Sequence, residues 1–250
     1  MSISKNKIAE IKKLAQKKFR EESDCFIVEG TKSVGDLLRS KLKVVEVFAT
    51  ESWLAEHADL TKNVNVVPVS ETELERITAL TTPQQVLAVA QRPHYSLADI
   101  DFADALLVLD GIRDPGNLGT IVRTADWFGF KQIVCSPDSV ELTNPKVIQA
   151  TMGSFSRMKV LYLNLPDFLK NAKIKGKIYG TFMQGRSIET VDFQQNDVLI
   201  IGNEGKGISA EVEKLVTDKI HIPSFAHSAD HAESLNASIA AAVVMYRFRM

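Results

Sequence analysis

The sequence predicts an α/β protein in two parts. A small α/β domain covers residues 1–91, and a larger domain over residues 105–250 holds a parallel sheet with helices on both faces. Three observations predict this class. Short apolar runs alternate with helical patterns in both parts. The runs of the second part are apolar almost throughout, as in strands that are buried on both faces. A polar stretch with a proline, residues 92–104, interrupts the alternation and is interpreted as a linker.

The first ninety residues justify the small domain element by element. Residues 4–19 predict a helix whose apolar face carries Ile8, Ile11, Ala15 and Phe19. The stretch Ser70-Glu71-Thr72-Glu73 is a capping box and begins another helix. Further helices are expected from Thr31 and from Ser52. The predicted strands are residues 25–29, 43–49, 65–69 and 86–91.

The second part repeats the alternation with more strands. The predicted strands are residues 105–110, 132–136, 159–163, 177–183, 197–202 and 219–223, and helices fall between most of them. The last helix, from about Ser234, is rich in alanine and valine. In parallel sheets of this kind, ligands bind beyond the carboxyl ends of the strands.

Composition favours a water-soluble cytoplasmic protein. The 250 residues are 45% hydrophobic with a net charge of −1, and the apolar run Ile239–Tyr246 is too short to span a bilayer. No signal peptide is visible at the N-terminus. Cys25 and Cys135 lie far apart, which fits a reducing compartment. His227 and His231 do not form a metalloprotease pattern, so no metal is expected.

The small net charge hides an asymmetry. Residues 1–43 hold eleven Lys and Arg against six Asp and Glu, whereas residues 44–110 hold three against eleven. A basic N-terminal end could attract a polyanion such as RNA. The candidate RNA-binding side chains are Lys12, Lys13, Lys17, Lys18 and Arg20. A solvated helix face is the alternative.

The segment IIGNEGKGIS, residues 200–209, places three glycines at the end of a predicted strand. It is not a phosphate-binding P-loop, because Ile208 stands where that loop needs lysine and Glu204 adds a negative charge. Gly205 to Ala210 match the dinucleotide pattern G-x-G-x-x-A, but the next strand ends without the carboxylate that the pattern requires. A dinucleotide loop and a purely structural turn stay open as alternatives.

Two further segments carry candidate polar residues. In NLGTIVRTADWFGF, residues 117–130, Asn117 is at a predicted helix N-cap and Arg123 follows among apolar neighbours. Such an arginine could be a paired core residue. In ESLNASIAAAVVMY, residues 233–246, Ser234 and Asn236 are by themselves ordinary helix caps.

Taken together, the three segments resemble the three motifs of the SpoU/TrmH family of RNA 2′-O-ribose methyltransferases, within the SPOUT superfamily. The resemblance covers residues 105–250, and residues 1–91 look like the substrate-binding domain of the rRNA-type members. It implies an S-adenosylmethionine-dependent transfer of a methyl group to a ribose 2′-hydroxyl, in 23S rRNA. It also implies a homodimer and a C-terminal trefoil knot.

The resemblance assigns roles residue by residue. The implied catalytic set is Arg123, Asn117, Glu204, Ser234 and Asn236. The implied cofactor-binding set is Thr181, Gly202, Asn203, Gly207, Ile222 and Leu235. The dimer is expected to use the Arg123 helix and the last helix, which carries Ala240, Ala241, Val243 and Val244. Residues 224–233 form a longer loop than the family pattern leads us to expect.

Three other functions stay open at this point. One is a tRNA 2′-O-methyltransferase, and another is a catalytically silent RNA-binding protein with the same fold. The third is a nucleotide-dependent dehydrogenase that uses the G-x-G-x-x-A loop.

Overall fold

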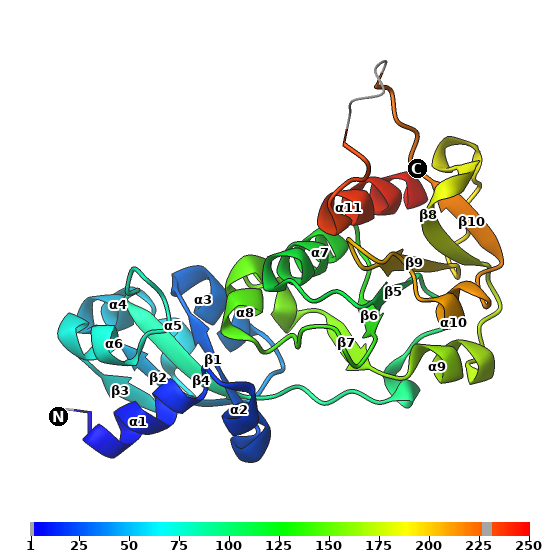
Figure 1. Cartoon of the computed structure of the whole chain (residues 1–250). Coiled ribbons are helices and arrows are strands. Elements are labelled where there is room, and N and C mark those ends of the chain that lie inside the picture. The colour runs from blue at the N-terminus through cyan, green and yellow to red at the C-terminus, as the bar shows by residue number, and fades with distance from the viewer. Residues whose placement is uncertain (1–2, 227–231) are drawn as a thin grey trace. The chain divides into compact units, whose positions relative to one another are not determined.

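A computed structural model describes residues 3–226 and 232–250 of the chain, which forms two compact units (Figure 1). Unit 1 consists of Met1–His94 and Glu141–Arg157, and unit 2 consists of Tyr95–Val140 and Met158–Met250. The chain thus leaves unit 2 after Val140, adds one segment to unit 1, and returns at Met158. The domain boundaries predicted from the sequence, 1–91 and 105–250, do not include this transfer of residues 141–157 to unit 1, and they stay a prediction.

Unit 1 is built on a mixed four-stranded sheet with the order β1-β4-β2-β3. Its strands are β1 (Cys25–Glu29), β2 (Val44–Ala49), β3 (Val66–Pro68) and β4 (Val86–Gln91), close to the predicted positions. Strand β4 pairs antiparallel with both β1 and β2, whereas β2 and β3 are parallel.

The helices of unit 1 are α1 (Lys5–Lys13), α2 (Lys17–Ser23), α3 (Thr31–Arg39), α4 (Glu51–Glu56), α5 (Ala58–Thr61) and α6 (Glu71–Ile77). The predicted single helix over residues 4–19 is wrong, because the backbone becomes extended at Gln16. The break buries Leu14 in the core and leaves Ala15 exposed. The capping box of Ser70 and Glu73 on α6 is confirmed.

Residues 141–157 complete unit 1. They form α8 (Pro145–Thr151) and a short 3₁₀ turn, η2 (Ser154–Ser156), and α8 packs on β1. The Phe155 ring meets the Phe26 ring edge to face, with 6.0 Å between ring centres. Gly153 has φ +95°, and a Cβ there would lie 2.2 Å from a carboxylate oxygen of Asp36. Only glycine therefore fits this close approach to α3.

Unit 2 contains a six-stranded, fully parallel sheet with the order β10-β8-β9-β5-β6-β7. The strands are β5 (Leu106–Asp110), β6 (Gln132–Cys135), β7 (Lys159–Tyr162), β8 (Ile178–Ser187), β9 (Val198–Gly202) and β10 (Asp218–His221). The predicted parallel sheet is confirmed. Strand β8 runs further than expected, as far as Ser187.

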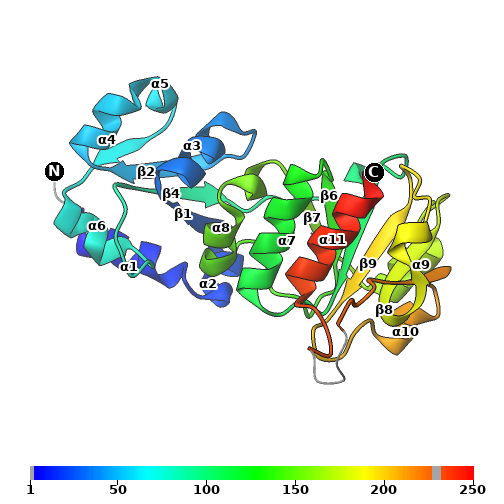
Figure 2. The ribbon, with the colours of Figure 1, turned by 90° about the horizontal axis from the view of Figure 1, so that it is seen from above.

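Helices cover both faces of this sheet. On one face, α9 (Leu165–Asn171) and α10 (Ala210–Glu213) pack in one apolar cluster with Val108 and Ile200. On the other, α7 (Pro115–Trp127) and α11 (Ala237–Phe248) lie side by side (Figures 1 and 2). Two 3₁₀ turns, η1 (Leu97–Asp99) and η3 (Ile188–Thr190), complete the unit. Among the described helices, none is long and apolar enough to cross a membrane.

Candidate active site

The glycine-rich loop after β9 folds back on itself. Asn203 and Gly207 exchange two backbone hydrogen bonds, of 3.0 and 2.8 Å, and the Asn203 side-chain oxygen accepts from the amides of Gly205 and Lys206, both at 3.0 Å. A Cβ on Gly202 would lie 2.3 Å from the carbonyl carbon of Gly207. Gly202 is thus required by the loop's own backbone, whereas nothing lies within 4 Å of a Cβ built on Gly207.

The loop that follows β5 is fastened from two sides. Asn203 donates a 2.8 Å hydrogen bond to the carbonyl of Gly111, and the carboxylate of Asp110 accepts one of 2.8 Å from the amide of Ser209. From the strand on the other side, the hydroxyl of Ser136 accepts from the amide of Gly111 at 2.8 Å. These bonds hold the β5 loop and the glycine-rich loop in one arrangement.

Three polar side chains from the three motif segments meet above this arrangement. The amide nitrogen of Asn117 donates a hydrogen bond to the carboxylate of Glu204. The amide nitrogen of Asn236 donates to the side-chain oxygen of Asn117 at 2.9 Å. The oxygen of Asn236 accepts from the amide and the hydroxyl of Ser238, in the first turn of α11. We call these three residues, Asn117, Glu204 and Asn236, the Asn–Glu–Asn cluster.

Two expected members of the catalytic set lie outside this cluster. Arg123 is exposed on α7, and within residues 3–226 and 232–250 no hydrogen bond or ion pair joins it to Glu204. It follows Asn117 by six residues in one helix, which turns its side chain away by about 120° and displaces it by about 9 Å. Its exposure also contradicts a buried core arginine. Ser234 is exposed and precedes α11.

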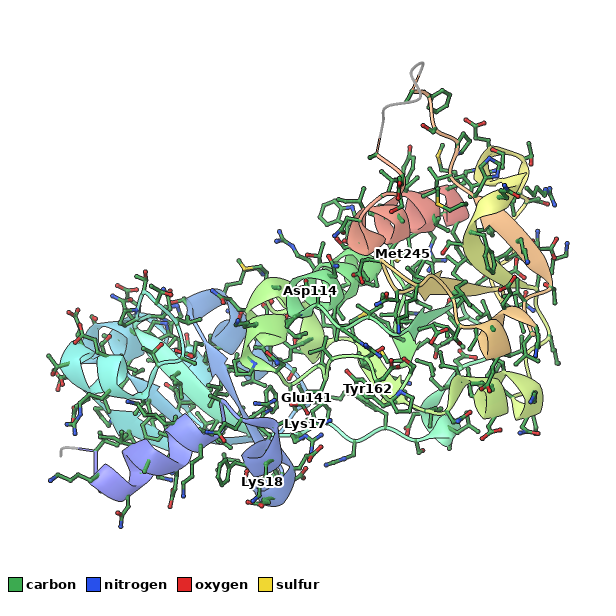
Figure 3. The ribbon with its side chains drawn as sticks, viewed as in Figure 1. Lys17, Lys18, Asp114, Glu141, Tyr162 and Met245 are labelled. Atoms are coloured by element: carbon green, nitrogen blue, oxygen red, sulfur yellow. The ribbon has the colours of Figure 1, made fainter. Side chains whose placement is uncertain are left out.

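The helix starts differ from the predicted ones. Asp114 (labelled in Figure 3), and not Asn117, is the N-cap of α7. Its carboxylate accepts from the amide of Asn117 at 2.8 Å. The last helix begins at Ala237, after the cap residue Asn236, so Ser234 is not a helix residue. Asn117 therefore lies in the first turn of α7, where its side chain is free to face the glycine-rich loop.

The expected cofactor-binding residues come from β8, from the end of β9 and the loop after it, from the residue that follows β10, and from the segment before α11. The three strands are adjacent in the sheet. The hydroxyl of Thr181 on β8 donates to the carbonyl of Ile200 on β9 at 3.2 Å. Ile222 follows β10 and is half-buried, while Leu235 is exposed. One residue before Ile222, the buried Nδ1 atom of His221 has no hydrogen-bond partner among the described residues. His227 and His231, and with them half of the longer loop, residues 227–231, lie outside the described residues.

The expected RNA-binding residues of unit 1 divide into two groups. Lys12, Lys13, Lys17 and Lys18 are exposed, and Lys17 and Lys18 share α2 (Figure 3). Arg20 does not belong with them, since it is only 1% exposed. Its guanidinium is paired with Glu141 and donates to the carbonyl of Leu14 at 2.7 Å. The prediction that Arg20 binds RNA is wrong, because the folded chain already uses this charge internally.

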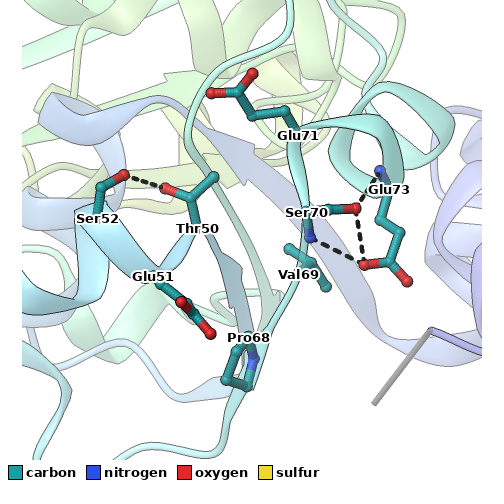
Figure 4. A pocket seen from close by; sticks show the side chains of 8 residues that line it. All are labelled: Thr50, Glu51, Ser52, Pro68, Val69, Ser70, Glu71 and Glu73. Carbon is teal, nitrogen blue, oxygen red and sulfur yellow. Dashed lines mark hydrogen bonds between the residues drawn. The ribbon is translucent and has the colours of Figure 1, made fainter.

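A hollow in unit 1 lies where β2 and β3 end and α4 and α6 begin (Figure 4). The residues that line it are Thr50, Glu51, Ser52, Pro68, Val69, Ser70, Glu71 and Glu73. Three carboxylates in this lining would repel phosphate groups. The hollow is therefore a poor place for an RNA backbone. In the described residues no group of His, Cys, Asp and Glu could hold a metal ion.

Several supporting residues were not predicted from the sequence. Asp110, Ser136 and Ser139 are buried polar residues at the carboxyl ends of β5 and β6, and all three bond to loop amides. The sequence feature that could have indicated the two serines is the polar stretch Ser136-Pro137-Asp138-Ser139 directly after an apolar strand. Residues at such strand ends in a parallel sheet face the ligand edge.

Family models match both parts of the chain. Residues 104–246 match the SpoU rRNA methylase family and residues 5–88 match the MRM3-like substrate-binding domain. The chain is 32% identical to a 23S rRNA (guanosine(2553)-2′-O)-methyltransferase of Bacillus subtilis, over 99% of this chain and 98% of that protein.

Two solved structures have the same fold over nearly their whole length. A TrmH-family protein from Porphyromonas gingivalis is 34% identical with a TM-score of 0.90, covering 99% of this chain and 98% of that one. An AdoMet-bound rRNA methyltransferase from Sinorhizobium meliloti is 29% identical with a TM-score of 0.88, covering 100% and 97%. The three meeting motif segments and these matches lead to one conclusion: the chain belongs to the SpoU rRNA methylase family.

Proposed function

We propose that this protein transfers a methyl group from S-adenosylmethionine to a ribose 2′-hydroxyl of 23S rRNA. The observation that carries the proposal is the Asn–Glu–Asn cluster, which joins the three family motifs at the carboxyl edge of the sheet. The family membership and the Bacillus subtilis relative, similar along the whole chain, support the reaction and the RNA class.

The residues at this edge fit S-adenosylmethionine. A Cβ on Gly207 would meet nothing within 4 Å, and one on Gly205 would meet only the side-chain oxygen of Asn203. Thr181, Gly202, Asn203 and Ile222 lie on or directly after the adjacent strands β8, β9 and β10, and Leu235 precedes α11. Glu204 supplies a carboxylate, which suits a sulfonium cation and would repel a dinucleotide phosphate. When bound, the cofactor supplies an activated methyl group. The dehydrogenase alternative is disfavoured further because α10 is only four residues long.

The polar side chains act on the ribose. Asn117 and Asn236 orient hydroxyl groups through their amides, and Glu204 holds Asn117 in place. A 2′-hydroxyl is a weak nucleophile, so the reaction needs a group that stabilises the oxyanion as the proton leaves. Arg123 is the catalytic residue proposed for this task, and its planar guanidinium can contact the oxyanion and a phosphate oxygen together.

The position of Arg123 points to a homodimer. The exposed face of α7 carries Arg123 and Trp127, and Trp127 is 83% exposed. Beside it, α11 exposes Ile239 and Tyr246. Large apolar side chains exposed together on two adjacent helices are unusual on the surface of a monomer. We place a second protomer on this face, with Arg123 of each protomer directed at the Asn–Glu–Asn cluster of the other.

Family membership also supports the C-terminal trefoil knot and a cytoplasmic protein. Both cysteines are unpaired, as a reducing compartment allows. Of the four alanine and valine residues expected at the interface, Ala241 and Val244 are buried inside the protomer. Ala240 and Val243 are half-buried and border the exposed face.

The test uses the purified full-length protein with labelled S-adenosylmethionine. We expect cofactor binding by calorimetric titration and methyl transfer to 23S rRNA from cells that lack the gene, at one mapped ribose. Transfer to tRNA alone would replace the rRNA assignment. A folded protein that binds RNA but no cofactor would overturn the proposal in favour of the silent RNA-binding protein. A monomer in sedimentation at micromolar concentration would reject the dimer.

A further inference from the structure

An ion pair crosses the carboxyl ends of β5 and β6, next to the Asn–Glu–Asn cluster. Arg113 follows β5 and donates a hydrogen bond of 2.8 Å to the carboxylate of Asp138, which follows β6. Arg113 is directly followed by Asp114, the N-cap of α7, and Asn117 lies one turn further. The pair therefore borders the proposed site on the side away from the glycine-rich loop, since the strand order is β9-β5-β6.

The backbone beneath Arg113 is held by buried hydroxyls. Ser136 accepts from the amide of Gly111 at 2.8 Å, and Ser139 accepts from the amide of Ile112 at 3.1 Å. The two hydroxyls also lie 3.0 Å apart, in hydrogen-bond contact. Ser136 and Ser139 are both buried. These bonds hold the backbone directly before Arg113 in place without a ligand, and so they fix where its side chain begins.

The carboxylate that orients Arg113 is itself anchored. Ser136 donates a 2.7 Å hydrogen bond to Asp138. This bond and the neighbouring Arg113 guanidinium lower the pKa of Asp138. Only one nitrogen of Arg113 is engaged by Asp138, and its side chain is 62% exposed. A guanidinium has five N–H donors. Among the described residues, no partner occupies the other donors of Arg113, so they can bind a ligand.

An exposed ion pair of this kind contributes little to stability. An oriented guanidinium with free donors is, however, well suited to a phosphate group, which it can bind with two parallel hydrogen bonds. We infer that Arg113 binds a backbone phosphate of the RNA next to the target ribose, and that Asp138 holds its side chain ready. This inference rests on the proposed function and names a contact of that same site.

The test compares three variants in RNA binding at several salt concentrations. For Arg113→Ala we expect roughly tenfold weaker RNA binding, typical of a lost charged hydrogen bond. The slope of log affinity against log salt should fall by about 0.7, as for one phosphate contact on single-stranded RNA. In methyl transfer, KM for RNA should rise while cofactor affinity and melting temperature stay unchanged.

The second variant separates RNA binding from a structural ion pair. In Asp138→Asn, the amide can still accept from Arg113, but the negative charge that competes with a phosphate is gone. RNA affinity should therefore stay equal or increase. If the Arg113–Asp138 pair only held the loop in place, Arg113→Ala and Asp138→Asn would both weaken RNA binding and cofactor binding. That result would overturn the inference.

The matched control is Lys131→Ala. Lys131 precedes β6, and its exposed ammonium pairs at 3.3 Å with the largely buried carboxylate of Asp104 at the opposite edge of the same sheet. Lys131→Ala should leave the salt dependence of RNA affinity and the KM for RNA as in the wild type. If Arg113→Ala behaves like this control, Arg113 does not bind RNA. Failure of the wild type to methylate any RNA would instead reject the proposed function, and the binding measurements would still decide the role of Arg113.

Discussion

Neutralising Glu141 should strongly destabilise unit 1. Its carboxylate accepts from Nε of Arg20 at 2.8 Å and also from a terminal guanidinium nitrogen, and a nitrogen of Arg92 lies 3.8 Å from its other oxygen. The side chains of Arg20 and Glu141 are only 2% and 11% exposed. Glu141→Gln keeps the shape but leaves a buried arginine without a counter-charge. Such a loss destabilises a protein by about 3–5 kcal/mol.

The assay is thermal unfolding of the full chain. At roughly 2–4 °C per kcal/mol for a chain of this size, the melting temperature should fall by about 6–20 °C. The control Glu21→Gln breaks the exposed pair with Lys17, whose atoms lie 3.7 Å apart, and should change stability by less than about 1 kcal/mol. The double variant Arg20→Met, Glu141→Leu should recover most of the loss. Equal melting of Glu141→Gln and Glu21→Gln would refute the reasoning.

Three further predictions concern function. Arg123→Ala should reduce methyl transfer about a hundred- to a thousandfold without changing the melting temperature or the cofactor affinity. Arg123→Lys should lose methyl transfer too, because an ammonium group lacks the planar fork of a guanidinium. Normal transfer by the folded Ala variant would remove Arg123 from the mechanism. Changing Lys12, Lys13, Lys17 and Lys18 to Glu should weaken RNA binding and flatten its salt dependence, whereas an unchanged slope would make them a solvated face. Gly202→Ala should destabilise the glycine-rich loop by about 1–3 kcal/mol and weaken cofactor binding, while Gly205→Ala, whose Cβ would meet only Asn203 at 3.7 Å, should be tolerated.

Most of the fold could be predicted from local sequence patterns. Every strand of both sheets was expected within a few residues, because the strands form short apolar runs between helical patterns, and the buried parallel strands of unit 2 are apolar almost throughout. The break between α1 and α2 was not predictable in this way. The spacing of Ile8, Ile11 and Phe19 fits one helix, and the break at Gln16 is accompanied by the bond from Arg20 to the Leu14 carbonyl and by the long-range pairing of Arg20 with Glu141.

Arg20 shows the same limit in the site prediction. Beside Lys17 and Lys18 it looked like one more surface cation, and its true partner, Glu141, is 121 residues away in the sequence. Nothing local distinguishes an arginine that meets solvent from one that meets a distant carboxylate. The exchange of residues 141–157 into unit 1 is likewise a long-range event, and it creates the environment that buries Arg20.

The arrangement of Asn117 and Arg123 was, in contrast, already contained in the sequence. Once both residues are assigned to one helix, a separation of six residues places them on different faces. In one protomer this helix therefore directs the two side chains to different sides, and the structure accordingly joins Asn117 to Glu204 and Asn236 while Arg123 stays exposed. The proposed dimer resolves this division by supplying each cluster with the partner's arginine. Mixing inactive Arg123→Ala and Asn117→Ala protomers should then restore part of the methyl transfer, because one site of each mixed dimer keeps both residues. If Arg123 served its own protomer, each site of a mixed dimer would lack one of the two residues, and no activity would return.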